Sequence, residues 1–425
     1  MIKKIYALYK KSFTVSTDTR NIIPNSIFFA LKGENFNANK FALEALKKGA
    51  LYAVIDEKAY QTDKRLILVK DVLKTLQQLA SYHREKLGIP IISLTGSNGK
   101  TTTKELIKTV LSQKYNVTAT KGNLNNHIGV PLTLLSMTPK TEIGVVELGA
   151  NHAKEIEFLC TICKPDFGYI TNFGKAHLEG FGSLEGVVTA KSELYDYLNE
   201  HDKLVFINAD DKLQVEKSKG IESVSFGSKK SDFSITLAQA NPFVSVLYKE
   251  LLINSNLIGN YNFSNIAAAI IIGAHFKVPE TAIKKAIEEY KPTNNRSQII
   301  KTKQNKVILD AYNANPTSMR CALENLSDLT DENKIAILGD MFELGEYAPF
   351  EHQKIVDLIS DCTIDFVYLL GENFAKTTIK SRKIKVFKTF KDFEKTFNKN
   401  AIKDTTFLVK GSRGMALERV MDFID

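Results

Sequence analysis

The chain has 425 residues, which corresponds to about two to four domains at a usual size of roughly 100–200 residues each. Its content of 44% hydrophobic and 25% charged residues is ordinary for a soluble globular protein. The net charge of +9 favours anionic partners, but the basic residues are scattered among acidic ones. Because they form no basic block, we expect a phosphate-rich small molecule as the partner and no nucleic acid.

No segment approaches the roughly 18 apolar residues of a membrane span, and the first residues lack the apolar run of a signal peptide. The 4 cysteines are too few for a disulfide framework, so a cytoplasmic location is expected. Cys160 and Cys163 form a C-x-x-C pair without a second pair or a histidine at metal spacing. We therefore expect both thiols on the inner face of a short helix.

Residues 1–82 predict a small first domain with short strands, such as 27–31, and short helices, such as 42–48. A second domain is predicted over residues 83–292, and it opens with a mostly apolar run at 89–94 that is typical of a buried parallel strand. A helix over 72–87 leads into it. The elements expected after the first strand are helices over 101–114, 183–199 and 279–290 and strands over 143–147, 167–171 and 204–208.

A third domain is predicted over residues 293–425, with the same alternation of strands and helices. Its expected strands cover 307–310, 335–338, 366–370 and 407–409, and its expected helices cover 316–329, 348–360 and 415–423. Such alternation predicts parallel sheets covered by helices, with ligands at the carboxyl ends of the strands. Met319, Ala322, Leu323 and Leu326 recur at helical spacing and are predicted to be core residues.

A glycine-containing loop lies between the first strand of the second domain and the helix that follows. It consists of Gly96, Ser97, Asn98, Gly99, Lys100, Thr101 and Thr102. Small residues let backbone N–H groups approach phosphate oxygens, and the start of a helix adds positive potential. Lys100 would reach the terminal phosphates of a nucleotide, and the Thr101 hydroxyl would bind Mg²⁺. Leu94 stands where the usual pattern has its first glycine, but the strand–loop–helix context favours a nucleotide site.

Further polar residues follow the predicted strands. Glu147 closes one strand, and His177 lies in the loop after the next. A carboxylate there could hold Mg²⁺, whereas an imidazole is a less typical ligand. For either residue alone, a loop hydrogen bond is an equally good interpretation. Lys191 lies in the middle of a helix, and from spacing alone we expect it to be a solvated surface lysine.

Together these motifs resemble the muramyl ligases of peptidoglycan synthesis. The resemblance covers nearly the whole chain and is carried by 96–102, 122–131, 147–151, 171–179, 310–316, 338–341, 343–345 and 410–413. It implies an α/β protein of three domains. These would be a small domain that binds the UDP-MurNAc-peptide, a central P-loop ATPase domain with a parallel sheet, and a C-terminal Rossmann-like domain.

The resemblance also implies a reaction. ATP would phosphorylate the terminal carboxylate of a UDP-MurNAc-tripeptide, and the amine of D-alanyl-D-alanine would attack the acyl phosphate. Because phosphorylation supplies the leaving group, positioning and charge stabilisation would carry most of the catalysis. A cytoplasmic monomer with two Mg²⁺ ions is expected.

The family's roles carry over to single residues. The loop from Gly96 to Thr102 would hold the ATP phosphates, with Lys100 as a catalytic residue. Thr101 and Glu147 would serve one Mg²⁺, and His177, also catalytic, would serve the other. Lys191 matches a catalytic lysine that CO₂ converts to a carbamate, which either binds metal or positions charge; this reverses the surface interpretation.

Four other residues match nucleotide contacts: Asn262 and Asn265 on the adenine side, and Arg296 and Asp310 from the third domain. The residues that would bind the UDP-MurNAc-peptide are Thr19, Arg20, Asn123 and Asn126. Two departures affect the detail of these contacts. Tyr261 stands where many relatives carry histidine, and 37–39 reads Asn-Ala-Asn where Asp-Gly-His or Asp-Ala-His is common.

Three other interpretations are open. Another muramyl ligase would add a single amino acid, but the run 312–316 favours a dipeptide-adding enzyme. Folylpolyglutamate synthase shares the ligation chemistry, but it lacks a first domain of this kind, and the run 123–131 argues against it. A P-loop switch or regulatory ATPase would need neither the first nor the third domain.

Overall fold

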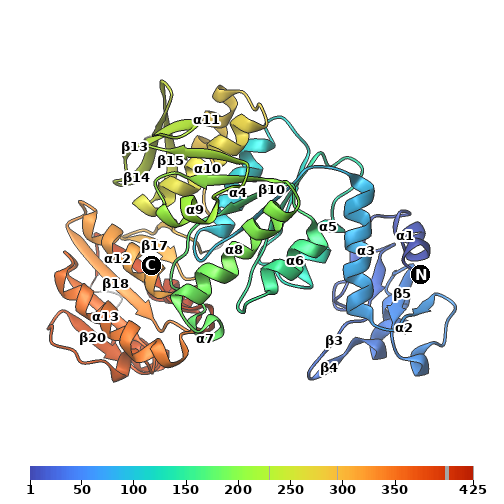
Figure 1. The fold of residues 1–425 in the computed structure, drawn as a ribbon. Helices are drawn as coiled ribbons and strands as arrows, with labels where there is room; N and C mark the ends of the chain where they lie inside the picture. Colours follow the sequence, from blue (N-terminus) through green and yellow to red (C-terminus); the bar gives the residue numbers. More distant parts are fainter. Residues whose placement is uncertain (229, 294, 398–401, 425) are drawn as a thin grey trace.

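The computed structural model describes residues 1–228, 230–293, 295–397 and 402–424, and it has three α/β parts in chain order (Figure 1). The N-terminal part, in blue, and the C-terminal part, in orange to red, lie on opposite sides of the central part. Within the described residues, none of the helices combines the length and the apolar character needed to cross a membrane.

The N-terminal part is built on a four-stranded parallel sheet in the order β1-β2-β5-β6. The strands are β1 (Val15–Ser16), β2 (Ile27–Phe29), β5 (Tyr52–Ile55) and β6 (Leu66–Leu68), with a hairpin of β3 (Lys32–Gly33) and β4 (Phe36–Asn37). Its helices are α1 (Ile2–Tyr9), α2 (Ala42–Lys47) and α3 (Val72–Leu87). Asp71 caps the start of α3, and Gly88 in the left-handed region ends it, so the predicted bounds of this helix are confirmed.

The central part holds a nine-stranded sheet in the order β15-β14-β13-β12-β11-β10-β7-β9-β8. The strands are β7 (Ile91–Thr95), β8 (Val117–Ala119), β9 (Ile143–Glu147), β10 (Phe167–Ile170), β11 (Leu204–Asn208), β12 (Ser223–Gly227), β13 (Phe233–Gln239), β14 (Phe243–Tyr248) and β15 (Leu251–Ile258). Its strands run parallel from β8 to β13, but β13, β14 and β15 pair antiparallel. This antiparallel extension was not predicted, although Val244, Val246 and Tyr248 lie at alternate positions and are buried, as on one face of a strand.

Helices cover both faces of the central sheet. They are α4 (Lys100–Leu111), α5 (Gly129–Leu134), α6 (Glu155–Cys163), α7 (Leu178–Phe181), α8 (Leu184–Glu200), α9 (Lys212–Lys217), α10 (Phe263–His275) and α11 (Glu280–Glu289). Cys160 and Cys163 are buried on α6, as predicted. The ladder pairs Leu94 with Glu147 and Thr95 with Ile170, so β7, β9 and β10 end side by side. This edge is where a parallel sheet places a ligand.

The C-terminal part has a six-stranded sheet in the order β16-β17-β21-β18-β19-β20, parallel except for β16. The strands are β16 (Gln298–Lys301), β17 (Lys306–Asp310), β18 (Asn333–Gly339), β19 (Phe366–Leu370), β20 (Ile384–Phe387) and β21 (Thr405–Lys410). Its helices are α12 (Pro316–Asp328), α13 (Ala348–Asp361), α14 (Phe390–Thr396) and α15 (Met421–Ile424). The predicted core stripe on α12 is buried.

One predicted helix is wrong. Instead of a helix over 415–423, the chain forms two 3-10 turns, Arg413–Met415 and Leu417–Val420, before the short α15. Ala416 separates the turns with φ +48°, a left-handed conformation that cannot continue an α-helix.

Candidate active site

The glycine-containing loop connects β7 to α4 and is held by the segment that follows β10. The backbone N–H of Asn98 donates to Asn172 Oδ1 at 3.2 Å, and its carbonyl accepts from Thr171 Oγ1 at 2.6 Å. A Cβ at Gly96 would lie 2.0 Å from that same Thr171 hydroxyl, so the close approach of loop and strand requires glycine. The loop is therefore rigidly supported at the carboxyl edge of the sheet.

Lys100 begins α4 and lies within this loop. Its Nζ donates to the carbonyl of Gly96 at 2.6 Å. Burial lowers the pKa of Lys100, although the Glu147 carboxylate acts in the opposite direction. A lysine that folds over its own loop beside a helix N-terminus is placed to bind the oxygens of a polyphosphate.

Glu147 ends β9 and is buried with several polar partners. Its Oε2 accepts from Thr101 Oγ1 at 3.1 Å, and its Oε1 accepts from Asn125 Nδ2 at 2.9 Å. Lys104 Nζ lies 3.8 Å from Oε2, and burial lowers the pKa of this lysine. A hydroxyl and a carboxylate next to a phosphate loop are the hard oxygen ligands that Mg²⁺ prefers. Across the residues that the structure describes, three or more His, Cys, Asp or Glu side chains nowhere converge, so phosphates and waters would have to complete the coordination.

His177 lies at the start of α7, where it meets the C-terminal part. Its Nδ1 is 2.6 Å from Glu343 Oε2, and this contact lowers the pKa of Glu343. The backbone of His177 is left-handed, with φ +52°. The imidazole thus joins two parts of the chain at the rim of the site.

Lys191 is fully buried in α8, so the surface interpretation from spacing alone is wrong. Its Nζ donates to the carbonyl of Ala150 at 3.2 Å and lies 5.0 Å from the centre of the Phe181 ring. Burial lowers its pKa well below the ordinary value, and Lys100 lowers it further. An amine of low pKa is a better nucleophile at neutral pH, which is what reaction with CO₂ requires.

Two asparagines of the central part lie behind the loop at the start of α10. Asn265 Nδ2 donates to Asn262 Oδ1 at 2.7 Å, and Asn265 Oδ1 accepts from Thr103 Oγ1 at 3.0 Å. Asn262 Nδ2 donates to the carbonyl of Ile258 at 2.8 Å. A Cβ at Gly99 would lie 2.6 Å from Asn265 Oδ1, so α10 packs directly against the phosphate loop.

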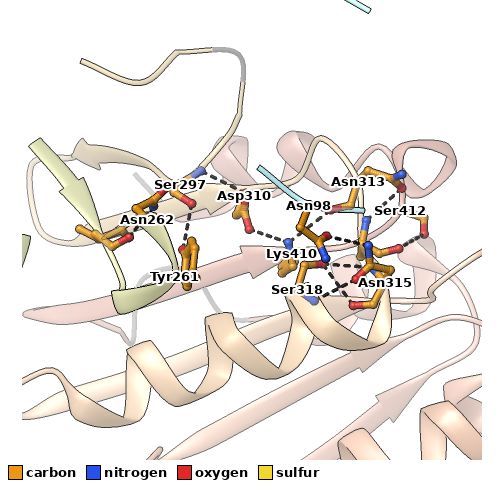
Figure 2. A network of polar contacts seen from close by, with 12 residues as sticks. Asn98, Tyr261, Asn262, Ser297, Asp310, Asn313, Asn315, Ser318, Lys410 and Ser412 are labelled. Carbon is orange, nitrogen blue, oxygen red and sulfur yellow. Dashed lines mark hydrogen bonds and ion pairs between the residues drawn. The ribbon is translucent and has the colours of Figure 1, made fainter. Parts of the chain in front are cut away.

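The C-terminal part supplies the opposite wall (Figure 2). Asp310 accepts from the backbone N–H of Ser297 at 3.0 Å, and Lys410 Nζ lies 2.5 Å from its other carboxylate oxygen. Asn315 Nδ2 donates to Asn98 Oδ1 at 2.7 Å, which ties this wall to the phosphate loop.

The two walls enclose a cavity of about 820 Å³. Most of the predicted site residues line it: Ser97, Asn98, Gly99, Lys100, Thr101, Thr102, Asn123, Asn126, Glu147, His177, Asn262, Asn265, Arg296 and Asp310. Gly96 and Lys191 do not line it themselves, but Lys100 and Ala150, which they contact, do.

Two predicted site residues lie elsewhere. Thr19 and Arg20 belong to the N-terminal part and do not line the cavity. The Arg20 guanidinium pairs with Asp18 at 2.7 Å, and its side chain is 89% exposed.

Several lining residues had not been proposed from the sequence. Asn125, Tyr312, Asn315, Glu343 and Lys410 all lie within motifs that had been noted as a whole. Only Asn315 carries a local signal, because it precedes Pro316 as an N-cap residue does.

The comparisons with known proteins agree with this arrangement. Residues 94–273 match the Mur ligase middle domain, and residues 295–413 match the glutamate ligase domain of Mur ligases. The chain belongs to the Mur ligase family and is a ligase.

Its relatives point to one branch of that family. The chain is 35% identical over 420 residues to the UDP-N-acetylmuramoyl-tripeptide–D-alanyl-D-alanine ligase of Bacillus subtilis, over 96% of this chain and 92% of that protein. The identically named ligase of Escherichia coli is 33% identical over 431 residues, over 96% and 92% of the two chains.

Solved structures agree. The crystal structure of MurF from Acinetobacter baumannii aligns with a TM-score of 0.86 and 30% identity, over 97% of this chain and 93% of that one. MurF from Thermotoga maritima, solved in complex with ADP, aligns with a TM-score of 0.83 and 27% identity, over 97% and 96%. The three-domain α/β architecture expected from the resemblance is thereby confirmed.

Proposed function

We propose that this chain joins D-alanyl-D-alanine to UDP-N-acetylmuramoyl-tripeptide at the expense of ATP, in the cytoplasmic synthesis of peptidoglycan precursors. The observation that carries the proposal is the similarity along nearly the full length to ligases of that name. The shared name favours addition of a dipeptide over addition of a single amino acid.

The reaction has two steps. A carboxylate oxygen of the tripeptide attacks the γ-phosphorus of ATP, so that ADP leaves and an acyl phosphate forms. The amine of D-alanyl-D-alanine then attacks the carbonyl carbon, loses a proton, and expels inorganic phosphate as the amide forms. The chain's main task is to position the three reactants and to stabilise the negative charge of their phosphates and carboxylates. Lys100, Arg296 and the loop residues Ser97 to Thr102 line the cavity and suit that task.

Metal ions would be held by side chains of the same cavity. Thr101 and Glu147 would bind one Mg²⁺ and His177 the other, with Lys191, as a carbamate, providing a further anionic ligand. Bound Mg²⁺ neutralises phosphate oxygens and makes phosphorus more electrophilic. The contact between Thr101 and Glu147 supports the first assignment, and the buried amine of low pKa supports carbamate formation at Lys191.

The peptide substrate would extend from the cavity towards the N-terminal part. Asn123 and Asn126 line the cavity on the central side and would face the muramyl-peptide. Thr19 and Arg20 would contact the uridine nucleotide at the far end of this long substrate. We propose a monomer as the working unit.

Phosphate release tests the proposal. Release from ATP and UDP-MurNAc-tripeptide should depend on D-alanyl-D-alanine, and the amide product should appear in equal amount. D-Alanine alone, as the matched control, should give little product. Release that proceeds without the dipeptide, or ligation of a single amino acid at a similar rate, would show that the assignment is wrong.

A further inference from the structure

We propose that the hydroxyl of Tyr261 is a positioning group. It fixes the backbone of the linker, residues 295–297, between the central and C-terminal parts, and thereby the direction in which the linker presents Arg296 to the nucleotide. The inference rests on the proposed use of ATP. Tyr261 lies in the 3-10 turn before α10, in the central part, and its ring lines the cavity.

A chain of polar contacts runs from this hydroxyl to the C-terminal sheet (Figure 2). Tyr261 Oη lies 3.0 Å from Ser297 Oγ, and the backbone N–H of Ser297 donates to Asp310 Oδ1 at 3.0 Å. Lys410 holds the other oxygen of Asp310. The buried Ser297 therefore forms one hydrogen bond to the central part through its side chain and one to the C-terminal part through its backbone.

The linker backbone needs such support. Asn295 and Ser297 are left-handed, with φ +55° and +48°, a region that residues other than glycine enter only at a cost in free energy. Such conformations persist where the surroundings hold them. Here the carbonyl of Asn295 accepts from the backbone N–H of Tyr312 at 3.2 Å, and Ser297 is held from both sides.

Arg296 lies between these two left-handed residues. Its guanidinium stacks on the Tyr312 ring at 3.7 Å from the ring centre and lines the cavity. The backbone on either side of Arg296 decides which way this cation points. By fixing Ser297, the Tyr261 hydroxyl fixes the direction of Arg296 without touching it.

The position of the Tyr261 ring is itself constrained. A Cβ at Gly259 would lie 2.3 Å from the ring, so glycine leaves the space that the ring occupies. Phenylalanine at 261 keeps this packing and removes only the hydroxyl. The substitution therefore separates the polar contact from the ring.

The test uses the full-length enzyme with Tyr261→Phe, Ser297→Ala and the double variant. We expect each single variant to weaken ADP binding, measured by calorimetry, about three- to tenfold, as loss of one buried neutral hydrogen bond does. The double variant should bind ADP no more weakly than either single variant, because both remove the same contact. The kcat/KM for ATP should fall with the ADP affinity, whereas the KM for D-alanyl-D-alanine should stay unchanged.

Tyr115→Phe is the matched control, because its hydroxyl donates to the carbonyl of Phe276 at 2.7 Å within the central part, away from the linker. It should leave ADP binding unchanged. Unchanged ADP affinity in Tyr261→Phe and Ser297→Ala, or additive effects in the double variant, would overturn the inference.

If Tyr261→Phe fails to fold, the ADP affinity and the kcat/KM for ATP of Ser297→Ala alone test the inference. ADP binding is measured without peptide substrates, so a wild-type enzyme that fails to ligate the dipeptide would refute the proposed function and leave this test standing.

Discussion

At the scale of single residues, two lysines of the central part have different surroundings. Lys100 faces the cavity from the phosphate loop, whereas Lys191 is enclosed within α8 and the residues around Ala150. Burial lowers the pKa of both. We propose that Lys100 binds the phosphates as a cation and that Lys191 reacts with CO₂ as an amine.

We predict that Lys100→Ala abolishes turnover, with a loss of at least about 100- to 1000-fold, because a charge that stabilises the transferring phosphoryl group is removed. Phosphate release at saturating substrates measures this. Lys108→Ala, an exposed lysine on the same helix, is the control and should behave as the wild type. Near-normal turnover of Lys100→Ala would remove this lysine from the phosphate site.

For Lys191 we predict that the alanine variant is inactive and that formate or acetate partly restores its turnover. The small carboxylic acid would occupy the space of the missing carbamate and supply its charge. Lys100→Ala should not respond to the same acids, and this variant serves as the control. A fully active Lys191→Ala enzyme would contradict the carbamate assignment.

At the scale of elements, the start of α12 serves both the helix and the site. Asn315 Oδ1 accepts from the backbone N–H of Ser318 at 2.9 Å, and the Ser318 hydroxyl completes a capping box. The same amide uses its nitrogen to reach Asn98 in the phosphate loop. The cap therefore presents a hydrogen-bond donor to the loop at a fixed position.

We predict that Asn315→Ala lowers the free energy of unfolding by about 1 kcal/mol and weakens ATP binding. Asn315→Ser should keep most of the cap, because a serine hydroxyl can accept from the backbone N–H of Ser318. It should lose the hydrogen bond to Asn98, because the serine side chain is too short to reach the phosphate loop as well. It should therefore unfold like the wild type in urea and still show a raised KM for ATP.

Thr389→Ala is the control for this experiment, since Thr389 caps α14 away from the cavity. It should change stability alone. An Asn315→Ser enzyme with the KM of the wild type would show that the contact with the loop has no role.

At the scale of the whole molecule, the C-terminal part is packed against the central part. Lys175 Nζ lies 2.6 Å from Glu351 Oε1 on α13, and the backbone N–H of Lys175 donates to the hydroxyl of Thr317 on α12. Leu178 and Val187 pack into the core of the C-terminal part. Glu351 is only 5% exposed, so it depends on Lys175 as its partner.

We predict that Lys175→Met loosens this packing by about 1–2 kcal/mol, between the value of an exposed ion pair and that of a buried charged hydrogen bond. The kcat/KM for ATP should then fall about five- to thirtyfold, and small-angle scattering should show a larger radius of gyration. Adding Glu351→Gln to Lys175→Met should restore part of the lost kcat/KM, because it removes the buried charge that the first substitution leaves unpaired.

Lys306→Met is the matched control for the domain contact. Lys306 pairs with Asp331 at the same distance of 2.6 Å, and the two lysines are similarly exposed, but this pair lies inside the C-terminal part and its carboxylate is 30% exposed. It should lower stability without enlarging the molecule. An unchanged radius and rate in Lys175→Met would show that other contacts hold the two parts together.

The sequence by itself determined the features that depend on neighbours along the chain. The alternation of strands and helices, the bounds of α3, β9, β11 and β19, and the phosphate loop follow from local patterns. Each depends on residues within one or two turns or along one strand, where apolar spacing, caps and glycines act directly.

Only the tertiary structure decided which side chains share an environment. Lys191 has the spacing of a surface lysine, yet the segments around Ala150 and Phe181 bury it. Tyr261 meets Ser297, and His177 meets Glu343, across parts of the chain that a helix or strand pattern does not connect. The burial, the pKa and the polar partners of a side chain depend on neighbours from distant segments. Those neighbours are in place only once the three parts have packed.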